Sequence, residues 1–281
     1  MLTAAELQSL LRAHRLRLTK RLGQHHLVDA RVVERIVEAC QLTPTDTVLE
    51  IGPGLGALTE GLAERAGRVV AVEVDRGIAT LLRARLAGRH NVTVACEDVL
   101  RYSWAGVRDA VAVGAIPYHI TAPIIVALYE HRRAIRRAVL ILQREVGGRL
   151  AAKPGTKAYG RLSVLGQYAW DIVTLFGVPR SAFYPQPEVD SVCVRLTARK
   201  EARVVVDDEA TLFDVVKAAF AQRRKTLANC LSGPQGLGLS RSEAEAVLQR
   251  AGLPAGVRGE TLSLSQFAAV ADRFAPMRRL R

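Results

Sequence analysis

Three glycines at alternate positions, Gly52, Gly54 and Gly56, directly follow the short apolar run 48–51. Such a run is typical of a strand buried on both faces, and the apolar residues after the glycines recur at helical spacing. A strand that enters a helix through glycines brings backbone N–H groups close to a ligand, because no Cβ intervenes. The pattern alone also fits a tight turn without a ligand, so its interpretation depends on the neighbouring elements.

Carboxylates stand at the ends of the next two predicted strands. Strand 68–74 carries Glu73, and Asp98 follows strand 91–95. In nucleotide-binding α/β units, an acid at the first of these positions accepts hydrogen bonds from ribose hydroxyls. Asp98 can accept a hydrogen bond from an adenine amino group, or it can cap the next turn. The glycine spacing, and Glu50 within the first strand, differ from the dinucleotide fingerprint and fit S-adenosylmethionine better than NAD.

Two aromatic side chains are candidates for holding a planar substrate. Tyr118 follows the predicted strand 109–113 in a turn that Pro117 makes rigid and exposed. Phe183 begins the loop 183–191, in which two prolines restrict the backbone. A tyrosine buried in the core is the competing interpretation of Tyr118.

These residues require an α/β scaffold to bring them together. Strands and helices alternate along the chain, and the last two predicted strands are closely connected. This order favours a mainly parallel sheet with an antiparallel edge hairpin. The further predicted elements are strands 136–142, 170–176 and 190–196 and helices 30–41 and 161–168.

The composition changes at the charged linker 199–208, and the remainder of the chain has helical patterning interrupted by glycine and proline. We therefore predict an α/β domain over residues 1–200 and a small helical domain over 201–281. The predicted C-terminal helices lie at about 209–231, 240–251 and 263–274.

The 281-residue chain has a net charge of +13, from 40 Lys and Arg against 27 Asp and Glu. This excess favours a polyanionic partner, nucleic acid before an anionic membrane, although a generally Arg-rich proteome gives the same balance. No apolar run reaches membrane-spanning length, and no signal-peptide core is present. The four scattered cysteines and the adjacent His25 and His26 lack metal-ligand spacing. We expect a cytoplasmic chain with reduced thiols and no metal.

Basic residues gather in three stretches that are candidates for phosphate contacts. One is an arm near the N-terminus, one is the polar loop 151–160, and one is placed on the first helix of the C-terminal domain. The candidate RNA-binding residues are Arg15, Arg17, Lys20, Arg21, Lys153, Lys157, Arg223, Arg224 and Lys225.

Several of these stretches, in order, resemble the rRNA adenine N6-dimethyltransferase family (KsgA-type small-subunit dimethyladenosine transferases). The resemblance runs from about residue 17 to 274, and residues 258–262 are similar to the family's C-terminal helix motif. The other stretches that carry it are residues 20–24, 49–56, 73–75, 97–98, 116–118, 183–191 and 220–227.

The resemblance implies a seven-stranded Rossmann-like methyltransferase sheet that binds S-adenosylmethionine at the carboxyl ends of its strands. Gln24 and His25 would contact its methionine end, Glu73 its ribose and Asp98 its adenine amino group. The full set of implied cofactor contacts is Gln24, His25, Leu27, Gly52, Gly54, Glu73, Val74, Asp98, Val99 and Ala115. The implied catalytic set is Ala115, Ile116, Pro117, Tyr118 and Phe183, with the two aromatic rings stacking on the target adenine.

The implied function is dimethylation of two adjacent adenosines in a 3′-terminal hairpin of small-subunit (16S-type) rRNA. The implied partner is an immature 30S-type subunit during ribosome assembly, with no membrane partner and a monomeric enzyme. The C-terminal domain and the basic arm would grip the RNA backbone. A large-subunit rRNA adenine methyltransferase is an alternative, which the helical C-terminal segment disfavours.

Two residues depart from the family's pattern. Ala115 stands where the family normally has Asn or Asp, an acceptor for the target amino group, and His26 stands where Phe is common. The backbone carbonyl of Ile116 or Pro117 is a possible replacement for the missing acceptor. Ala115 therefore keeps open a second hypothesis: a catalytically weakened or inactive assembly or RNA-binding factor on the same fold.

Overall fold

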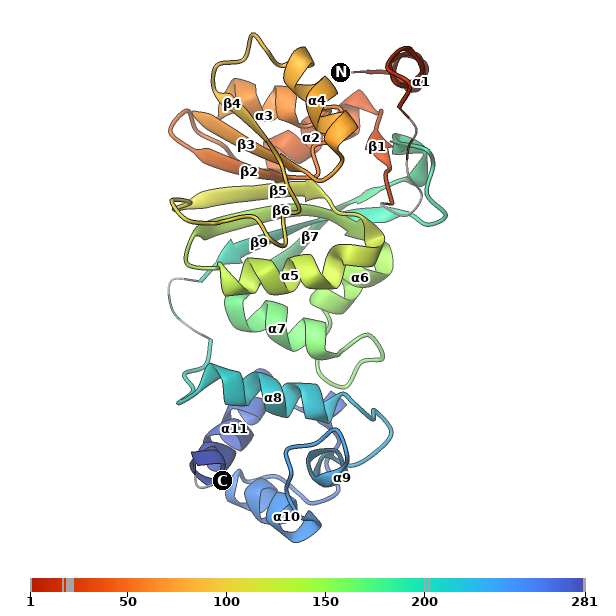
Figure 1. Cartoon of the computed structure of the whole chain (residues 1–281). Helices are drawn as coiled ribbons and strands as arrows, with labels where there is room; N and C mark the ends of the chain where they lie inside the picture. The colour runs from red at the N-terminus through yellow and green to blue at the C-terminus, as the bar shows by residue number, and fades with distance from the viewer. Residues whose placement is uncertain (1, 17, 19–22, 200, 202, 280–281) are drawn as a thin grey trace. The chain divides into compact units, whose positions relative to one another are not determined.

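The computed structural model describes residues 2–16, 18, 23–199, 201 and 203–279 (Figure 1). The chain forms two compact units. The first comprises Met1–Gly147 and Asp171–Ala198, and the second comprises Gly148–Trp170 and Arg199–Arg281. A boundary near residue 200 was predicted, but the assignment of all of residues 1–200 to one domain differs from this division.

Within the described residues, the first unit is organised around a seven-stranded sheet with strand order β4-β3-β2-β5-β6-β9-β7. The five strands from β4 to β6 pair in parallel, and β9 pairs antiparallel with β6. The mainly parallel α/β fold predicted from the sequence is confirmed. The strands are β2 (Thr47–Ile51), β3 (Arg68–Glu73), β4 (Val92–Cys96), β5 (Ala110–Ala115), β6 (Ile135–Gln143), β7 (Trp170–Val178) and β9 (Ser191–Ala198).

The central strands are apolar because helices cover both faces of the sheet (Figure 1). On one face lie α2 (Ala30–Ala39), α3 (Thr59–Arg65) and α4 (Arg76–Arg85), and α5 (Thr121–Glu130) lies on the other. Apolar side chains of α2 and α3 pack with those of β2 and β5 in one core cluster. This packing fixes the strand ends at which the glycine loop and the acids stand.

A two-stranded pairing absent from the sequence prediction joins the N-terminal segment to a distant loop. Strand β1 (His26–Leu27) runs antiparallel to β8 (Phe183–Tyr184), with Leu27 opposite Phe183. Helix α1 (Ala4–Ala13) packs its Leu7 and Leu11 into a second apolar cluster with Leu55 of the glycine loop. Residues from both ends of the unit's sequence therefore surround the glycine loop.

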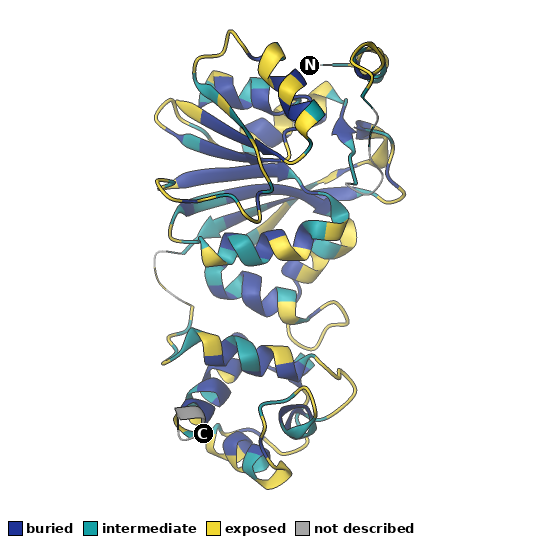
Figure 2. Ribbon diagram, in the orientation of Figure 1, coloured by how far each residue is buried: buried dark blue, intermediate teal, exposed yellow. Residues whose placement is uncertain are grey.

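The second unit is helical and, in the part of the chain that the structure describes, has its own buried core (Figure 2). Segment 148–170 belongs to it because Tyr159 donates a hydrogen bond to the Leu262 carbonyl at 2.8 Å and Tyr168 packs edge-on against Phe213. Its helices are α7 (Arg161–Ala169), α8 (Glu209–Ala219), α9 (Leu227–Ser232), α10 (Arg241–Arg250) and α11 (Leu264–Arg279), and α6 (Arg144–Leu150) ends inside it.

The predicted continuous helix 209–231 is wrong. Helix α8 ends at Ala219, and α9 starts anew after Thr226, whose hydroxyl accepts a hydrogen bond from the Asn229 N–H. The basic triplet that begins at Arg223 therefore lies in a turn and not on a helix. Among the described residues, no helix is long and apolar enough to cross a membrane.

Short 3₁₀ turns complete the local structure. They are η2 (Tyr118–Ile120), η3 (Arg180–Ala182) and η4 (Gly259–Thr261). The first contains the predicted site residue Tyr118, the second directly precedes Phe183, and the third lies in the second unit.

Candidate functional site

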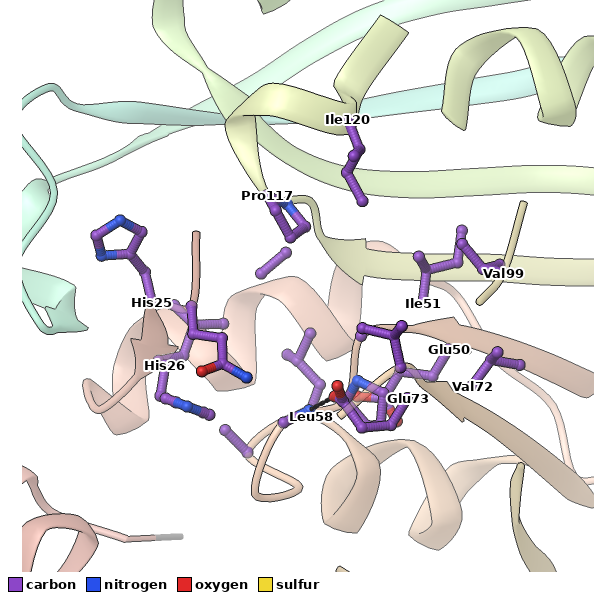
Figure 3. Close-up of a pocket in the computed structure, with 18 of the residues that line it drawn as sticks. His25, His26, Glu50, Ile51, Leu58, Val72, Glu73, Val99, Pro117 and Ile120 are labelled. Atoms are coloured by element: carbon purple, nitrogen blue, oxygen red, sulfur yellow. Dashed lines mark hydrogen bonds between the residues drawn. The ribbon is translucent and has the colours of Figure 1, made fainter. Parts of the chain in front are cut away.

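A pocket, which we call the main pocket, opens at the carboxyl ends of β2, β3, β4 and β5 (Figure 3). In open parallel sheets this edge is where ligands bind. The structure brings all ten predicted cofactor residues to the lining of this pocket. They are Gln24, His25, Leu27, Gly52, Gly54, Glu73, Val74, Asp98, Val99 and Ala115.

The glycine loop has the backbone geometry that the sequence pattern suggested. Gly52 and Gly54 have φ of +64° and +56°, in the left-handed region that favours glycine. A Cβ on Gly52 would meet nothing within 4 Å, so this position faces open space. A Cβ on Gly54 would lie 2.6 Å from Nδ1 of His26. The loop therefore leaves room for a ligand at Gly52, whereas the His26 ring fills the space beside Gly54.

Glu73 ties the end of β3 to the glycine loop. Its side chain is buried, and its two carboxylate oxygens accept hydrogen bonds from the Gly54 N–H at 3.1 Å and the Asp75 N–H at 3.0 Å. Burial raises the pKa of Glu73, while these N–H donors oppose the shift. The carboxylate is thus held at the pocket lining with a fixed orientation.

The far wall of the pocket combines an acid with apolar side chains. Asp98 follows β4, and its Oδ1 accepts a hydrogen bond from the Leu100 N–H at 3.0 Å, so the turn-capping role considered from the sequence is present. The same side chain lines the pocket. Val74, which follows β3 and also lines the pocket, is 51% exposed, and Val99 is buried. A pocket lined by both an exposed valine and a carboxylate suits a flat heterocycle with an amino edge.

A smaller cavity, the aromatic hollow, shares His25, Ala115 and Pro117 with the main pocket. Both predicted stacking residues, Tyr118 and Phe183, line it, as does the buried Ile116. The structure therefore places all five predicted catalytic residues around one hollow that adjoins the main pocket.

The two aromatic rings are held differently. Tyr118 is half-buried, its hydroxyl lies 3.0 Å from the Ser191 hydroxyl, and its ring stacks with His25 at a centroid distance of 5.9 Å. Burial raises the pKa of Tyr118. Phe183 is only 6% exposed because β8 pairs with β1 and its ring joins the core cluster. Tyr118 therefore presents more surface to the hollow than Phe183 does.

The backbone carbonyls near Ala115 are not equivalent. The Pro117 carbonyl accepts hydrogen bonds from the Ile120 N–H at 3.1 Å and the Thr121 hydroxyl at 3.4 Å. The Ile116 N–H donates to the Ile141 carbonyl at 3.0 Å. Within the described ranges, no hydrogen bond to the Ile116 carbonyl is found. Ile116 is therefore the better of the two backbone acceptors proposed from the sequence.

Sequence reasoning gave no role to two buried polar residues of the main pocket, Glu50 and His26. Burial raises the pKa of Glu50 to about 8 and lowers that of His26 to about 4. Glu50 Oε2 and His26 Nε2 are buried without a hydrogen-bond partner among the described residues. The available signal was an acid inside an apolar strand and a histidine where a phenylalanine is common.

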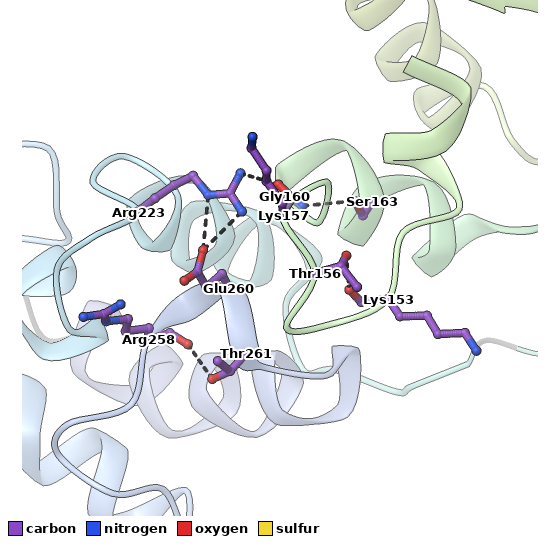
Figure 4. A network of polar contacts seen from close by, with 9 residues as sticks. All are labelled: Lys153, Thr156, Lys157, Gly160, Ser163, Arg223, Arg258, Glu260 and Thr261. Atoms are coloured by element: carbon purple, nitrogen blue, oxygen red, sulfur yellow. Dashed lines mark hydrogen bonds and ion pairs between the residues drawn. The ribbon is translucent and has the colours of Figure 1, made fainter. Parts of the chain in front are cut away.

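In the second unit, Arg223 takes part in a network of polar contacts that also includes the loop carrying Lys153 and Lys157 (Figure 4). Arg223 donates to Glu260 Oε2 at 3.1 and 3.3 Å and to the Lys157 carbonyl at 2.9 Å. The Gly155 N–H donates to the Glu260 carbonyl at 2.8 Å. Arg223 is thus engaged in fixing the loop 153–157, although it was predicted as a phosphate contact.

The other candidate cations of this unit, which we call the basic surface, are exposed: Lys153, Lys157, Arg224 and Lys225. Arg15 is exposed just after α1 in the first unit. The predicted contacts Arg17, Lys20 and Arg21 lie outside the described residues.

The seven-stranded sheet, the glycine loop and the acids at consecutive strand ends define a Rossmann-like methyltransferase fold. The family model described as ribosomal RNA adenine dimethylase matches residues 15–274. The chain therefore belongs to the ribosomal RNA adenine dimethylase family, and it is a methyltransferase.

Individual relatives agree with this assignment. The chain is 44% identical over 267 residues to ribosomal RNA small subunit methyltransferase A of Geobacillus kaustophilus, covering 92% of this chain and 91% of the relative. It is 45% identical over 260 residues to the protein of the same name from Moorella thermoacetica, covering 88% and 89%.

Solved structures give the same fold. A dimethyladenosine transferase from Plasmodium falciparum superimposes with a TM-score of 0.78 at 25% identity, covering 89% of this chain and 97% of that one. The 23S rRNA methyltransferase ErmE superimposes with a TM-score of 0.65 at 30% identity, covering 89% and 99%.

Proposed function

We propose that this methyltransferase transfers methyl groups from S-adenosylmethionine to N6 of two adjacent adenosines in a 3′-terminal hairpin of small-subunit rRNA. The observation that carries the proposal is the contiguity of the main pocket and the aromatic hollow, which share Ala115 and Pro117. A methyl donor in the first and an adenine in the second would meet at these residues. The names of the relatives at 44–45% identity support the small-subunit substrate.

The residues that line the main pocket support S-adenosylmethionine as its ligand. Gly52 leaves open space beside the loop, where a side chain would intrude on the ligand. Glu73 would hold the ribose hydroxyls and Asp98 the adenine amino group, with Gln24 and His25 near the methionine end. When bound, the cofactor supplies an activated methyl group on a sulfonium, so positioning and electrostatics carry much of the acceleration.

The aromatic hollow would hold the target base. An adenine must leave its stack to react, at a cost of a few kcal/mol, and stacking on an aromatic ring offsets this cost. Tyr118, anchored through Ser191, would provide the main stacking surface. Phe183, being almost fully buried, would close the base of the hollow.

The remaining requirement is an acceptor for the amino group. The N6 lone pair is delocalised into the purine ring, so its N–H groups need acceptors while the nitrogen becomes more tetrahedral. With Ala115 in the usual place of Asn or Asp, the Ile116 carbonyl takes this role. The Pro117 carbonyl already accepts two hydrogen bonds.

The exposed basic surface and the basic N-terminal arm would contact the RNA backbone, in accord with the net charge of +13. We expect the helical unit to act as an RNA-binding domain and the enzyme to work as a cytoplasmic monomer on an immature 30S-type subunit.

Ala115 favours a second candidate function, a ribosome-assembly factor that binds RNA with weak or no methyl transfer. One assay separates the two. The chain is incubated with methyl-labelled S-adenosylmethionine and under-methylated small subunits, and modified adenosines are then mapped. Label at two adjacent adenosines near the 3′ end supports the enzyme. Cofactor binding without label supports the assembly factor.

A further inference from the structure

Another hollow, which we call the flanking hollow, has no role in the proposed function. It is lined by Gln143, Arg144, Glu145, Val189 and Asp190, and its cavity volume is about 470 Å³. All five residues belong to the first unit. Ligand pockets typically have volumes of about 300–1,000 Å³, so the flanking hollow is large enough to hold a nucleobase.

Strands β6 and β9 connect the flanking hollow to the aromatic hollow. Ile141 lines the aromatic hollow, and Gln143, two residues further along β6 and therefore on the same face, lines the flanking hollow. Across the antiparallel pair, Gln143 lies directly opposite Ser191, whose hydroxyl lies 3.0 Å from that of Tyr118. The Cβ atoms of directly opposed residues are about 5 Å apart. A base stacked on Tyr118 would therefore have the flanking hollow next to it.

The charges of the lining do not suit a phosphate group. Its ionisable side chains are one cation, Arg144, and two acids, Glu145 and Asp190, although the chain as a whole has a net charge of +13. Arg144 is already paired, because its Nη2 donates to Asp190 Oδ2 at 3.2 Å. Since this pairing neutralises the cation and a second acid remains, the lining disfavours an anion and favours an uncharged group with N–H donors.

Gln143 and Val189 provide contacts that suit a purine base. Gln143 is partly buried, and among the described residues no hydrogen bond to its side-chain amide is found. A glutamine amide has both an acceptor and donors, and it pairs with adenine by accepting from the N6 amino group and donating to N7. Val189 is 45% exposed and offers an apolar surface to the ring.

We propose that the flanking hollow binds the base of the adenosine next to the target, and that Gln143 determines the specificity for adenine there. The proposal rests on the proposed function, in which the two target adenosines are adjacent. When one adenine leaves its stack for the aromatic hollow, its neighbour loses a stacking partner, and unstacked bases in RNA are recognised through their exposed edges. Val189 packs against this second base, while the Gln143 amide pairs with its N6 and N7 atoms.

The test compares single-turnover methyl transfer to three kinds of under-methylated small subunits. One kind keeps both adenosines, and each of the others has the 5′ or the 3′ adenosine replaced by guanosine. Guanosine keeps the purine rings but presents O6 in place of the N6 amino group. The test variant is Gln143→Met, which keeps the length of the side chain without the amide. The matched control is Gln249→Met, because Gln249 is exposed on α10 and lies outside both hollows.

For at least one of the two replacements, we expect the wild type to methylate the remaining adenosine about 5- to 150-fold more slowly than the same adenosine beside an adenosine, which is the discrimination of one bidentate contact. Gln143→Met should lose this preference, so that its rates with the two neighbours become equal. Gln249→Met should keep it.

A preference that persists in Gln143→Met, or equal rates of the wild type on all three substrates, overturns the proposal. If Gln143→Met does not fold, Gln143→Asn takes its place, since its shorter side chain withdraws the amide by one methylene and should lose the same preference. No methyl transfer by the wild type to the subunits that keep both adenosines would instead refute the proposed function.

Discussion

The main pocket of the first unit and the basic surface of the second unit hold their ionisable side chains in opposite ways. In the pocket, Glu73 and Glu50 are buried, and backbone N–H groups orient Glu73. On the basic surface, Arg224 and Lys225 are exposed, and neighbouring Arg223 organises a loop instead of facing a ligand. Buried charges are few, fixed and energetically sensitive, whereas exposed charges are screened and individually weak. Substitutions in the two regions should therefore differ in size.

The largest expected effect tests the acceptor beside the pocket. Replacing Ala115 by Asn should raise the rate of methyl transfer by up to about 100-fold, since losing one preorganised polar contact typically reduces a rate about 10²–10³-fold. Single-turnover transfer to under-methylated small subunits measures the change. Ala115→Leu, similar in size to Asn but without an acceptor, is the control. An unchanged rate for Ala115→Asn would show that this position does not limit catalysis.

The glycine loop should give the next largest effect. Gly54→Ala forces a left-handed backbone on a residue with a Cβ and brings that Cβ against the His26 ring. The left-handed strain of about 1–2 kcal/mol should move the loop out of its binding geometry, and a loss of that size weakens S-adenosylmethionine binding, measured by calorimetry, about 5- to 30-fold. Gly88→Ala is the control, since its φ is ordinary and its Cβ would meet nothing within 4 Å.

A double variant can separate the two causes of the weaker binding in Gly54→Ala, the backbone strain and the contact with His26. The double variant Gly54→Ala with His26→Ala removes the steric contact and keeps the backbone strain. Its affinity should lie between those of Gly54→Ala and His26→Ala. Affinity equal to that of Gly54→Ala alone would assign the whole loss to the backbone.

The pH dependence of the unfolding free energy tests whether Glu50 costs stability when it ionises. The folded-state pKa of Glu50, about 8, lies above its ordinary value of 4.5. The folded state therefore binds the Glu50 proton more tightly than the unfolded state does. The stability that this proton contributes is complete below pH 4.5 and is lost as the pH rises towards 8. Urea unfolding should show Glu50→Gln gaining on the wild type by up to about 1.4 kcal/mol per pH unit between pH 5 and 8. Parallel pH profiles for the two proteins would contradict the raised pKa of Glu50.

The smallest effects should come from the basic surface, and they should differ between adjacent arginines. Arg224→Ala should weaken RNA binding a few-fold and reduce the slope of log affinity against log salt by about one, as expected for a single phosphate contact. Arg223→Ala should mainly expose the loop 153–157 to proteolysis. It should lower the unfolding free energy by about 0.5–1 kcal/mol, because its ion pair is partly exposed.

A charge exchange checks the Arg223 assignment. The double variant Arg223→Glu with Glu260→Arg should recover part of the lost stability relative to either single variant. If Arg223→Ala reduced the RNA affinity and the salt slope as much as Arg224→Ala does, Arg223 would contact phosphate directly.

The local part of the site could be predicted from the sequence. The positive φ values at Gly52 and Gly54, and the carboxylates of Glu73 and Asp98 at the pocket, follow from spacing within short stretches. A strand, a loop and a helix that are consecutive in the chain fix their junctions by local rules. The parallel sheet follows in the same way from the order of strands and helices.

The sequence could not give features that depend on distant segments meeting. Leu27 lies opposite Phe183 because β1 and β8 pair across more than 150 positions, and that pairing buries the ring that was predicted to stack. Segment 148–170 joins the helical unit through Tyr159 and Leu262. Arg223 fixes a loop because Glu260 lies beside it.

The amino-acid sequence by itself determined the α/β architecture, the glycine loop and the family, since these are written in neighbouring residues and in the order of elements. Only the tertiary structure decided which polar groups are buried and which are left without partners, Glu50 above all. Burial is a property of everything packed around a side chain, and the pKa of a carboxyl follows its surroundings more than its position in the chain.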